Sequence, residues 1–167
     1  AMISKIYFPR LIVPSSTMIV GLVDFLISFF ILCLLMALYG YMPDWRILTL
    51  PLFLLLALAT AMGAGIWLAA LNVKYRDFRY IVPFMVQFGL YISPVGYSST
   101  LVPDKWRLLY SLNPMVGVID GFRWALLGGE SRLYPAGFLL SVGLTLLLLW
   151  SGLRYFRSVE RTFADVI

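Results

Sequence analysis

The spacing of the charged residues is the feature that most constrains what this chain can fold into. Three long stretches carry no charged side chain: residues 47–72, 80–103 and 133–153. A fourth, residues 11–43, carries only Asp24. A helix needs about 20 mostly apolar residues to cross the ~30 Å hydrocarbon layer of a bilayer. Because a backbone in lipid must satisfy its own hydrogen bonds, such stretches are expected to be helical. The sequence therefore predicts a multi-pass membrane protein.

Composition argues against an ordinary soluble domain. It would by itself still allow an apolar secreted protein, so the distribution of the charges decides. Of the 167 residues, 13% are charged and 62% are hydrophobic, whereas soluble domains carry about 25% charged residues. The charges present are too few to solvate a surface. A transmembrane β-barrel would instead show segments of about 10 residues with alternating polarity, and the apolar stretches here do not alternate.

We predict an all-α, polytopic membrane protein whose single transmembrane domain covers residues 1–167. Its third span is expected to be short, because Pro94 and Gly96 interrupt the helix before it has fully crossed. The four predicted transmembrane helices cover residues 16–39, 48–71, 80–95 and 135–156.

The segment 96–134 is too apolar for an exposed loop and too interrupted for one spanning helix. Prolines and glycines divide it into two short pieces, about residues 104–112 and 114–127. Apolar pieces of this length are more often re-entrant or interfacial than spanning. We therefore predict a re-entrant helical hairpin before the last span. Non-helical backbone at membrane depth is tolerated only inside protein or beside water, so the hairpin hints at a pathway.

Lysine and arginine predict the orientation, because cytoplasmic loops carry an excess of both. With four spans the two termini share a side, and that side holds the larger group of cations. We therefore expect residues 1–15 and the tail 157–167 to be cytoplasmic and the hairpin to lie on the outer side. The larger group is Lys5, Arg10, Lys74, Arg76, Arg79, Arg154, Arg157 and Arg161; the smaller is Arg46, Lys105, Arg107, Arg123 and Arg132.

No catalytic, metal or cofactor site is expected. The chain contains no histidine and one cysteine, Cys33, which is interpreted as an apolar filler. It also lacks the GxxxxGK[ST] phosphate loop, so ATP is not expected to bind here in that way. The basic residues lie near predicted membrane boundaries, where membrane lipids account for them better than nucleic acid does.

Charged residues within the apolar segments are the first candidates for function. A carboxylate inside a span costs roughly 2.5–3.5 kcal/mol on insertion scales, so Asp24 should face protein or water. It would line a path, pair with a cation on another span, or lie close enough to the interface to be hydrated. Asp120 and Arg123 are three residues apart and so share a helix face. They would form an internal ion pair or contact a phosphate or sugar at an outer gate.

Aromatic residues are dense around the hairpin. Rings with a polar edge suit both a membrane interface and a sugar chain, which has apolar C–H faces and hydroxyl groups. Tyr91, Tyr97 and Trp124 are the candidates for lining a path.

Several motifs, in this order, are similar to a known family. They are KIYFPR at residues 5–10, NVKYRDFRY at 72–80, LNPMVGVIDGFRW at 112–124 and the terminal VERTFADVI at 159–167. Over essentially its whole length the chain resembles the membrane permease of type-2 ABC exporters, in the polysaccharide branch. That branch exports O-antigen, capsular polysaccharide, teichoic acid and related polyol-phosphate polymers.

The chain departs from the family at its beginning. Permeases of this family have six spans preceded by an amphipathic helix on the cytoplasmic face, and the KIYFPR motif normally follows the second span. We therefore interpret the sequence as the C-terminal four spans of a six-span permease, with a four-span family member as the alternative.

The resemblance implies that residues 1–15 form the segment that docks on a separate ATPase subunit. The same residue types would also suit a plain membrane-interface segment. The short loop at 72–80 would make a second contact or would only fix topology. The candidate ATPase-contacting residues are Tyr7, Phe8, Pro9, Arg10, Lys74 and Arg76.

The implied protein is a homodimeric permease in the bacterial inner membrane that exports a lipid-linked glycan and is not itself an enzyme. A permease for drugs or other small molecules, from the same superfamily, is one alternative. A membrane scaffold with no transport role is the other.

Overall fold

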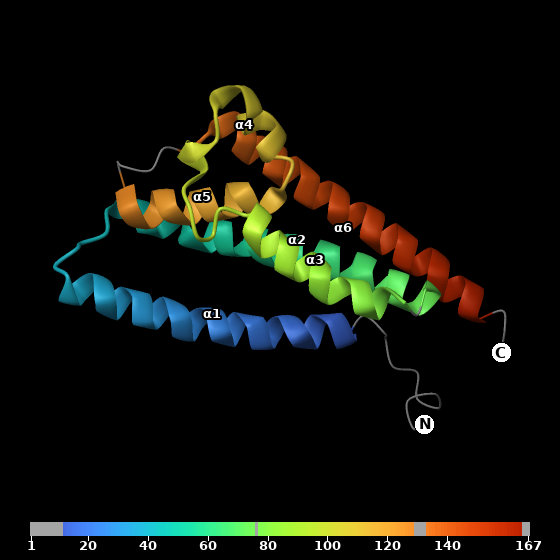
Figure 1. Cartoon of the computed structure of the whole chain (residues 1–167). Coiled ribbons are helices and arrows are strands. Elements are labelled where there is room, and N and C mark those ends of the chain that lie inside the picture. Colours follow the sequence, from blue (N-terminus) through green and yellow to red (C-terminus); the bar gives the residue numbers. More distant parts are fainter. Residues whose placement is uncertain (1–11, 76, 129–132, 165–167) are drawn as a thin grey trace. The chain divides into compact units, whose positions relative to one another are not determined.

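The computed structural model describes residues 12–75, 77–128 and 133–164, which fold entirely into helices, turns and loops (Figure 1). No strand occurs in these three ranges, so the all-α prediction is confirmed. Residues 1–42 and 43–167 form two compact units, and each is described by itself.

The first unit contains one long helix, α1 (Ile12–Leu38). It ends in a Schellman motif, in which Gly40 takes a φ of +69° and the Tyr41 amide donates to the Met36 carbonyl at 2.9 Å. Gly40 is favoured there because a residue without Cβ adopts a positive φ without strain.

The second unit is built on α2 (Leu50–Lys74) and α6 (Pro135–Ala164), which lie side by side (Figure 1). A short 3-10 helix, η1 (Trp45–Thr49), leads into α2, and the Asp44 side chain caps it by accepting from the Trp45 amide at 2.7 Å. The buried residues of α2 recur on one face: Leu50, Phe53, Thr60, Gly63, Ile66 and Ala70.

Contacts between α2 and α6 advance together along both helices. The Phe53 and Phe138 ring centroids are 5.6 Å apart, and the Thr60 and Thr145 hydroxyls form a hydrogen bond of 2.8 Å. Further along, the Trp67 indole donates to a Ser151 hydroxyl at 3.0 Å. Since partners advance in step, α2 and α6 run in the same direction. The chain between them must therefore return to the side where α2 begins.

Small residues let the two backbones approach closely, as is common between membrane helices. A Cβ on Gly63 would lie 3.0 Å from the backbone nitrogen of Leu149, and one on Gly152 would lie 3.1 Å from the Gly63 carbonyl oxygen. The two glycines therefore fit against each other across the α2–α6 interface.

The return path begins with α3 (Phe78–Ile92), which contains Pro83 and no buried residue. Its 15 residues extend about 22 Å, less than the ~30 Å of a hydrocarbon core. Three helices of the described chain are long and apolar enough to span a membrane: Met18–Leu38, Trp45–Lys74 and Pro135–Val159. The predicted short third span corresponds to α3, which ends at Ile92, three residues earlier than expected.

The described residues 93–128, which follow α3, are called the hairpin below. It contains the 3-10 helix η2 (Ser99–Leu101), α4 (Asp104–Tyr110) and α5 (Pro114–Leu127). The predicted break at residue 113 is present, because the Asn113 side chain caps α5 by accepting from the Met115 amide at 3.0 Å.

Glycines on α5 bring it against the α2–α6 pair. A Cβ on Gly117 would clash with the Ser141 side chain of α6, and one on Gly121 would clash with the Phe53 ring of α2. The hairpin therefore packs near the beginnings of α2 and α6 and does not extend along their whole length.

Replacing Gly63 with leucine tests the close approach of α2 and α6. Gly63→Leu should lower the free energy of unfolding by about 1–3 kcal/mol, since the side chain must displace the backbone of α6. Gly65→Leu is the matched control, because a Cβ at Gly65 meets nothing within 4 Å. Thermal unfolding of both variants in one detergent measures the difference. Equal unfolding temperatures would contradict the described interface.

Candidate functional site

The candidate site is a set of polar and aromatic side chains that the hairpin gathers near the start of α6. Tyr97 is at its centre. The Tyr97 hydroxyl lies 2.6 Å from that of Tyr110 on α4, and 3.2 Å and 3.1 Å from the carbonyl oxygens of Tyr91 and Ile92 at the end of α3. One hydroxyl thus joins α3, the following loop and α4.

Arg123, on α5, forms hydrogen bonds to the loop that follows α3. Its guanidinium donates to the Tyr97 carbonyl at 2.7 Å and to the Val95 carbonyl at 3.1 Å. These carbonyls belong to non-helical backbone, so they have no helical partner of their own. Arg123 therefore supplies hydrogen bonds that the loop needs to remain folded at this position.

Asp120, one helical turn before Arg123, is buried, with 7% of its surface exposed. Burial raises the pKa of the Asp120 carboxyl, while a hydrogen bond from Ser99 and the charges of Arg123 and Arg107 act to lower that pKa. Among the described residues, no salt bridge joins Asp120 to Arg123. A direct ion pair between them was one of our two hypotheses, and the structure contradicts it. The Arg123 guanidinium is engaged by backbone carbonyls instead.

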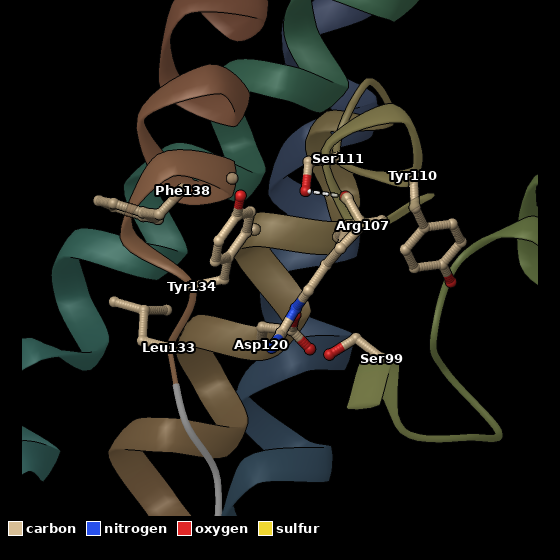
Figure 2. Close-up of a pocket in the computed structure, with 11 residues that line it drawn as sticks. Ser99, Arg107, Tyr110, Ser111, Asp120, Leu133, Tyr134 and Phe138 are labelled. Carbon is tan, nitrogen blue, oxygen red and sulfur yellow. Dashed lines mark hydrogen bonds between the residues drawn. The ribbon is translucent and has the colours of Figure 1, made fainter. Parts of the chain in front are cut away.

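Arg107 reaches the Asp120 side chain from α4, and Figure 2 shows it extending between Tyr134 and Ser99. Its guanidinium carbon lies 5.0 Å from the centre of the Tyr134 ring at the start of α6. Its Nη1 is 3.8 Å from Asp104, whose side chain is almost fully exposed. Such an exposed and long ion pair contributes little to stability.

Arg107 and Asp120 line one small cavity (Figure 2). Its volume of about 10 Å³ is close to the smallest that holds one water molecule. Ser99, Ser111 and Tyr134 contribute further polar atoms to its wall.

Trp124 lies in a packed position. Its ring meets that of Phe53 edge-on at 6.5 Å, and the Arg46 guanidinium lies 5.0 Å from the Trp124 ring centre. The cation–π contact with Arg46 joins α5 to η1, and such pairs contribute about 0.5–2 kcal/mol. Trp124 therefore fixes the end of α5.

The other candidate residues are dispersed. Tyr91 is 70% exposed on α3, and Lys74 lies 5.4 Å above the ring of its neighbour Tyr75 at the end of α2. Asp24 is exposed on α1. The predicted ATPase-contacting residues Tyr7, Phe8, Pro9, Arg10 and Arg76 lie outside the described residues.

The structure brings Tyr97, Asp120 and Arg123 together, and their role in a pathway stays a prediction. Sequence reasoning missed Ser99, Arg107 and Tyr110, which complete the cluster. The spacing of Arg107 and Tyr110 could have identified both as candidates. An arginine and a tyrosine three residues apart in an apolar segment share a helix face. No group of three or more metal-ligating side chains occurs in the described ranges.

An open groove of about 530 Å³ borders this cluster. Its wall is mostly apolar and comes from the end of α3 and from α4: Ile92, Val102, Trp106, Leu109, Tyr110, Leu112 and Asn113. Two of the polar side chains there are already paired, because Tyr110 bonds Tyr97 and the Asn113 amide donates to Ser93 at 2.9 Å. The groove therefore offers an apolar surface.

These features define the class of a polytopic helical membrane protein with an interrupted, polar hairpin before its last long helix. Residues 2–127 match the ABC-2 type transporter family. The chain belongs to this family, and the resemblance read from the motifs is confirmed.

Individual relatives match the sequence of this chain over different shares of its length. It is 28% identical, over 99% of its length, to the O-antigen export system permease protein RfbA of Myxococcus xanthus. It is 25% identical, again over 99%, to the protein of that name from Klebsiella pneumoniae. The inner membrane transport permease YadH of Escherichia coli K12 is 33% identical over 51% of the chain. The chain covers 64% and 63% of the two RfbA proteins and 32% of YadH.

Removing the Tyr97 hydroxyl tests whether this cluster holds the loop. Tyr97→Phe should increase amide exchange across residues 95–101 about fivefold or more, since each lost hydrogen bond contributes roughly 1 kcal/mol. Tyr91→Phe is the control, because no described hydrogen bond uses the Tyr91 hydroxyl. Hydrogen–deuterium exchange measures both variants. Equal exchange in the two would mean that the Tyr97 contacts do not hold the loop.

Proposed function

We propose that this chain is the membrane-spanning permease part of an ATP-driven exporter that moves a lipid-linked polysaccharide across the bacterial inner membrane. The observation that carries the proposal is the match to O-antigen export permeases over 99% of the chain. The order of long helices, short return helix and hairpin agrees with a permease of this kind.

ATP hydrolysis is assigned to a separate subunit, and two permease copies form the transport path. In this mechanism, both termini of the chain are cytoplasmic and the hairpin lies on the outer side. ATP binding moves the segment around Tyr7 and Arg10, and the movement opens a path between the two copies. A glycan of the O-antigen class is the proposed cargo, because the relatives that match along the whole chain are named for it.

The described helices suit a mechanism in which α2 and α6 transmit movement and the hairpin responds to it. Close packing and interhelical hydrogen bonds make α2 and α6 a stiff pair that can transmit movement along its length. The hairpin is held by polar contacts around Tyr97, Asp120 and Arg123, which can break and re-form when α2 and α6 shift. Asp24 on α1 is proposed to face the path.

A permease for a different cargo is the second candidate, and the likeness to YadH supports it. That match covers 51% of the chain, and the printed name specifies no glycan. The first experiment is purification of the full reading frame in mild detergent, followed by an ATPase assay. Co-purification of an ATPase subunit in constant proportion supports both permease candidates. Purification without any ATPase would favour the scaffold alternative.

Cargo is tested in a strain that lacks the reading frame. Surface O-antigen or capsule should disappear and return with the intact gene, while sensitivity to dyes and drugs stays unchanged. Changed drug sensitivity with normal surface glycan would favour the small-molecule candidate.

The docking segment makes a further prediction. Replacing Tyr7 and Arg10 with alanine should weaken ATPase association about tenfold, because aromatic and arginine anchors dominate binding energies. Lys105→Ala, at the opposite side of the predicted membrane, should leave association unchanged. Quantitative pull-down from the same membranes measures both. Undiminished association and export with the double alanine variant would exclude this segment as the docking site.

A further inference from the structure

Helix α4 contacts its neighbouring elements mainly through polar side chains. None of its residues is buried, and its large apolar side chains Trp106, Leu108 and Leu109 are each more than half exposed. Apolar packing therefore contributes little to its position. Its inward contacts are made by polar groups, chiefly the Tyr110 hydroxyl on Tyr97 and the guanidinium of Arg107.

Arg107 is the more deeply placed of these two contacts. Its side chain is 19% exposed, and its Nη2 is buried without a hydrogen-bond partner among the described residues. A buried donor of a charged group that lacks a partner is strongly unfavourable. The cavity of about 10 Å³ that Arg107 shares with Asp120 has room for one water molecule.

We propose that Arg107 and Asp120 form a water-bridged ion pair in this cavity, and that this pair is the lock that holds α4 on α5 and on the start of α6. The water accepts from Arg107 Nη2 and donates to the Asp120 carboxylate, and Ser99 lines the same cavity. Arg107 is thus a positioning residue, and α4 is a lid.

The Arg107–Asp120 pair also controls the width of the groove of about 530 Å³. Its wall is formed partly by Trp106, Leu109 and Tyr110 of α4, and partly by Ile92 at the end of α3. When the Arg107–Asp120 pair opens, this wall moves away from α3 and the groove widens. Because the pair is polar, water can replace each partner and the opening is reversible. The inference does not depend on which cargo the protein carries.

Cysteine labelling tests the lock. Ser111 follows α4 directly and is 3% exposed, so a cysteine there reports whether α4 has lifted. In a Cys33→Ser background, Ser111→Cys is reacted with a membrane-impermeant maleimide in nanodiscs, where both membrane faces are accessible. Arg107→Gln and Asp120→Asn should each raise the labelling rate about tenfold, since each leaves the other charge without its partner. Arg107→Lys, which keeps the charge, should raise it less.

Three controls make the outcome decisive. Lys105→Gln removes a cation from the exposed face of α4 and should not change labelling. Thr145→Cys, 1% exposed between α2 and α6, should stay unlabelled in every variant. The double variant Arg107→Gln with Asp120→Asn should label no faster than the faster single variant, because partners in one pair are not additive.

Other results would overturn the lock. Unchanged Ser111→Cys labelling in the near-isosteric Asp120→Asn variant would show that the pair does not hold α4. Additive effects in the double variant would show that the two residues act separately. Labelling of Thr145→Cys would show that the variants loosen the whole helix core. None of these readouts requires ATPase or glycan. Failure of the lock would therefore not contradict the proposed transport function.

Discussion

Hydrogen bonding of non-helical backbone in an apolar environment is the constraint on which the rest of this structure depends. A backbone group buried in hydrocarbon without a partner costs several kcal/mol. Helices avoid that cost internally, but residues 93–98, between α3 and η2, are not helical. There the Arg123 guanidinium donates hydrogen bonds to the carbonyls of Val95 and Tyr97. The Tyr97 hydroxyl donates to the carbonyls of Tyr91 and Ile92 at the end of α3. Two side chains thus permit the break that separates the short return helix from the hairpin.

Each of these side chains then needs support of its own. Arg123 carries a charge into a partly buried site, and the carboxylate of Asp120 one turn earlier compensates for it at a distance. Burial raises the pKa of Asp120, so its charge in turn depends on Ser99 and the two arginines. The cluster is stable as a set, because removal of any member leaves a buried polar group unsatisfied. This interdependence explains why Asp120 tolerates a position that would be unfavourable for an isolated carboxylate.

Local patterns predicted the helices well and their long-range contacts poorly. Charge-free stretches located the long helices, and the proline and glycine breaks located α5, because both signals act within a few residues. The Asp120–Arg123 spacing predicted a shared helix face but not the hydrogen-bond partners of the Arg123 guanidinium. Helical periodicity places two side chains on one face, yet it cannot reveal that the carbonyls of Tyr97 and Val95, 26 and 28 residues away, bind the Arg123 guanidinium. Trp124 was assigned to a path on residue type alone, whereas Phe53 and Arg46 pack against its ring. Arg107 and Ser99 meet Asp120 only through the tertiary fold.

The two kinds of contact in this molecule differ in how they respond to movement. The α2–α6 interface relies on backbone proximity at Gly63 and Gly152, and van der Waals contact falls off steeply when helices separate. That interface therefore favours one arrangement. The hairpin contacts are hydrogen bonds and charge interactions, and water can replace a partner where the cluster borders the open groove. A shift that α2 and α6 transmit as a pair would consequently be absorbed in the hairpin, where partners can exchange. The stiff pair meets the exchangeable hairpin at Phe53, whose ring contacts both α6 and α5, and also at Ser141 of α6, against which Gly117 of α5 packs. Movement of the long helices would therefore reach the hairpin through α5, which contacts both of them.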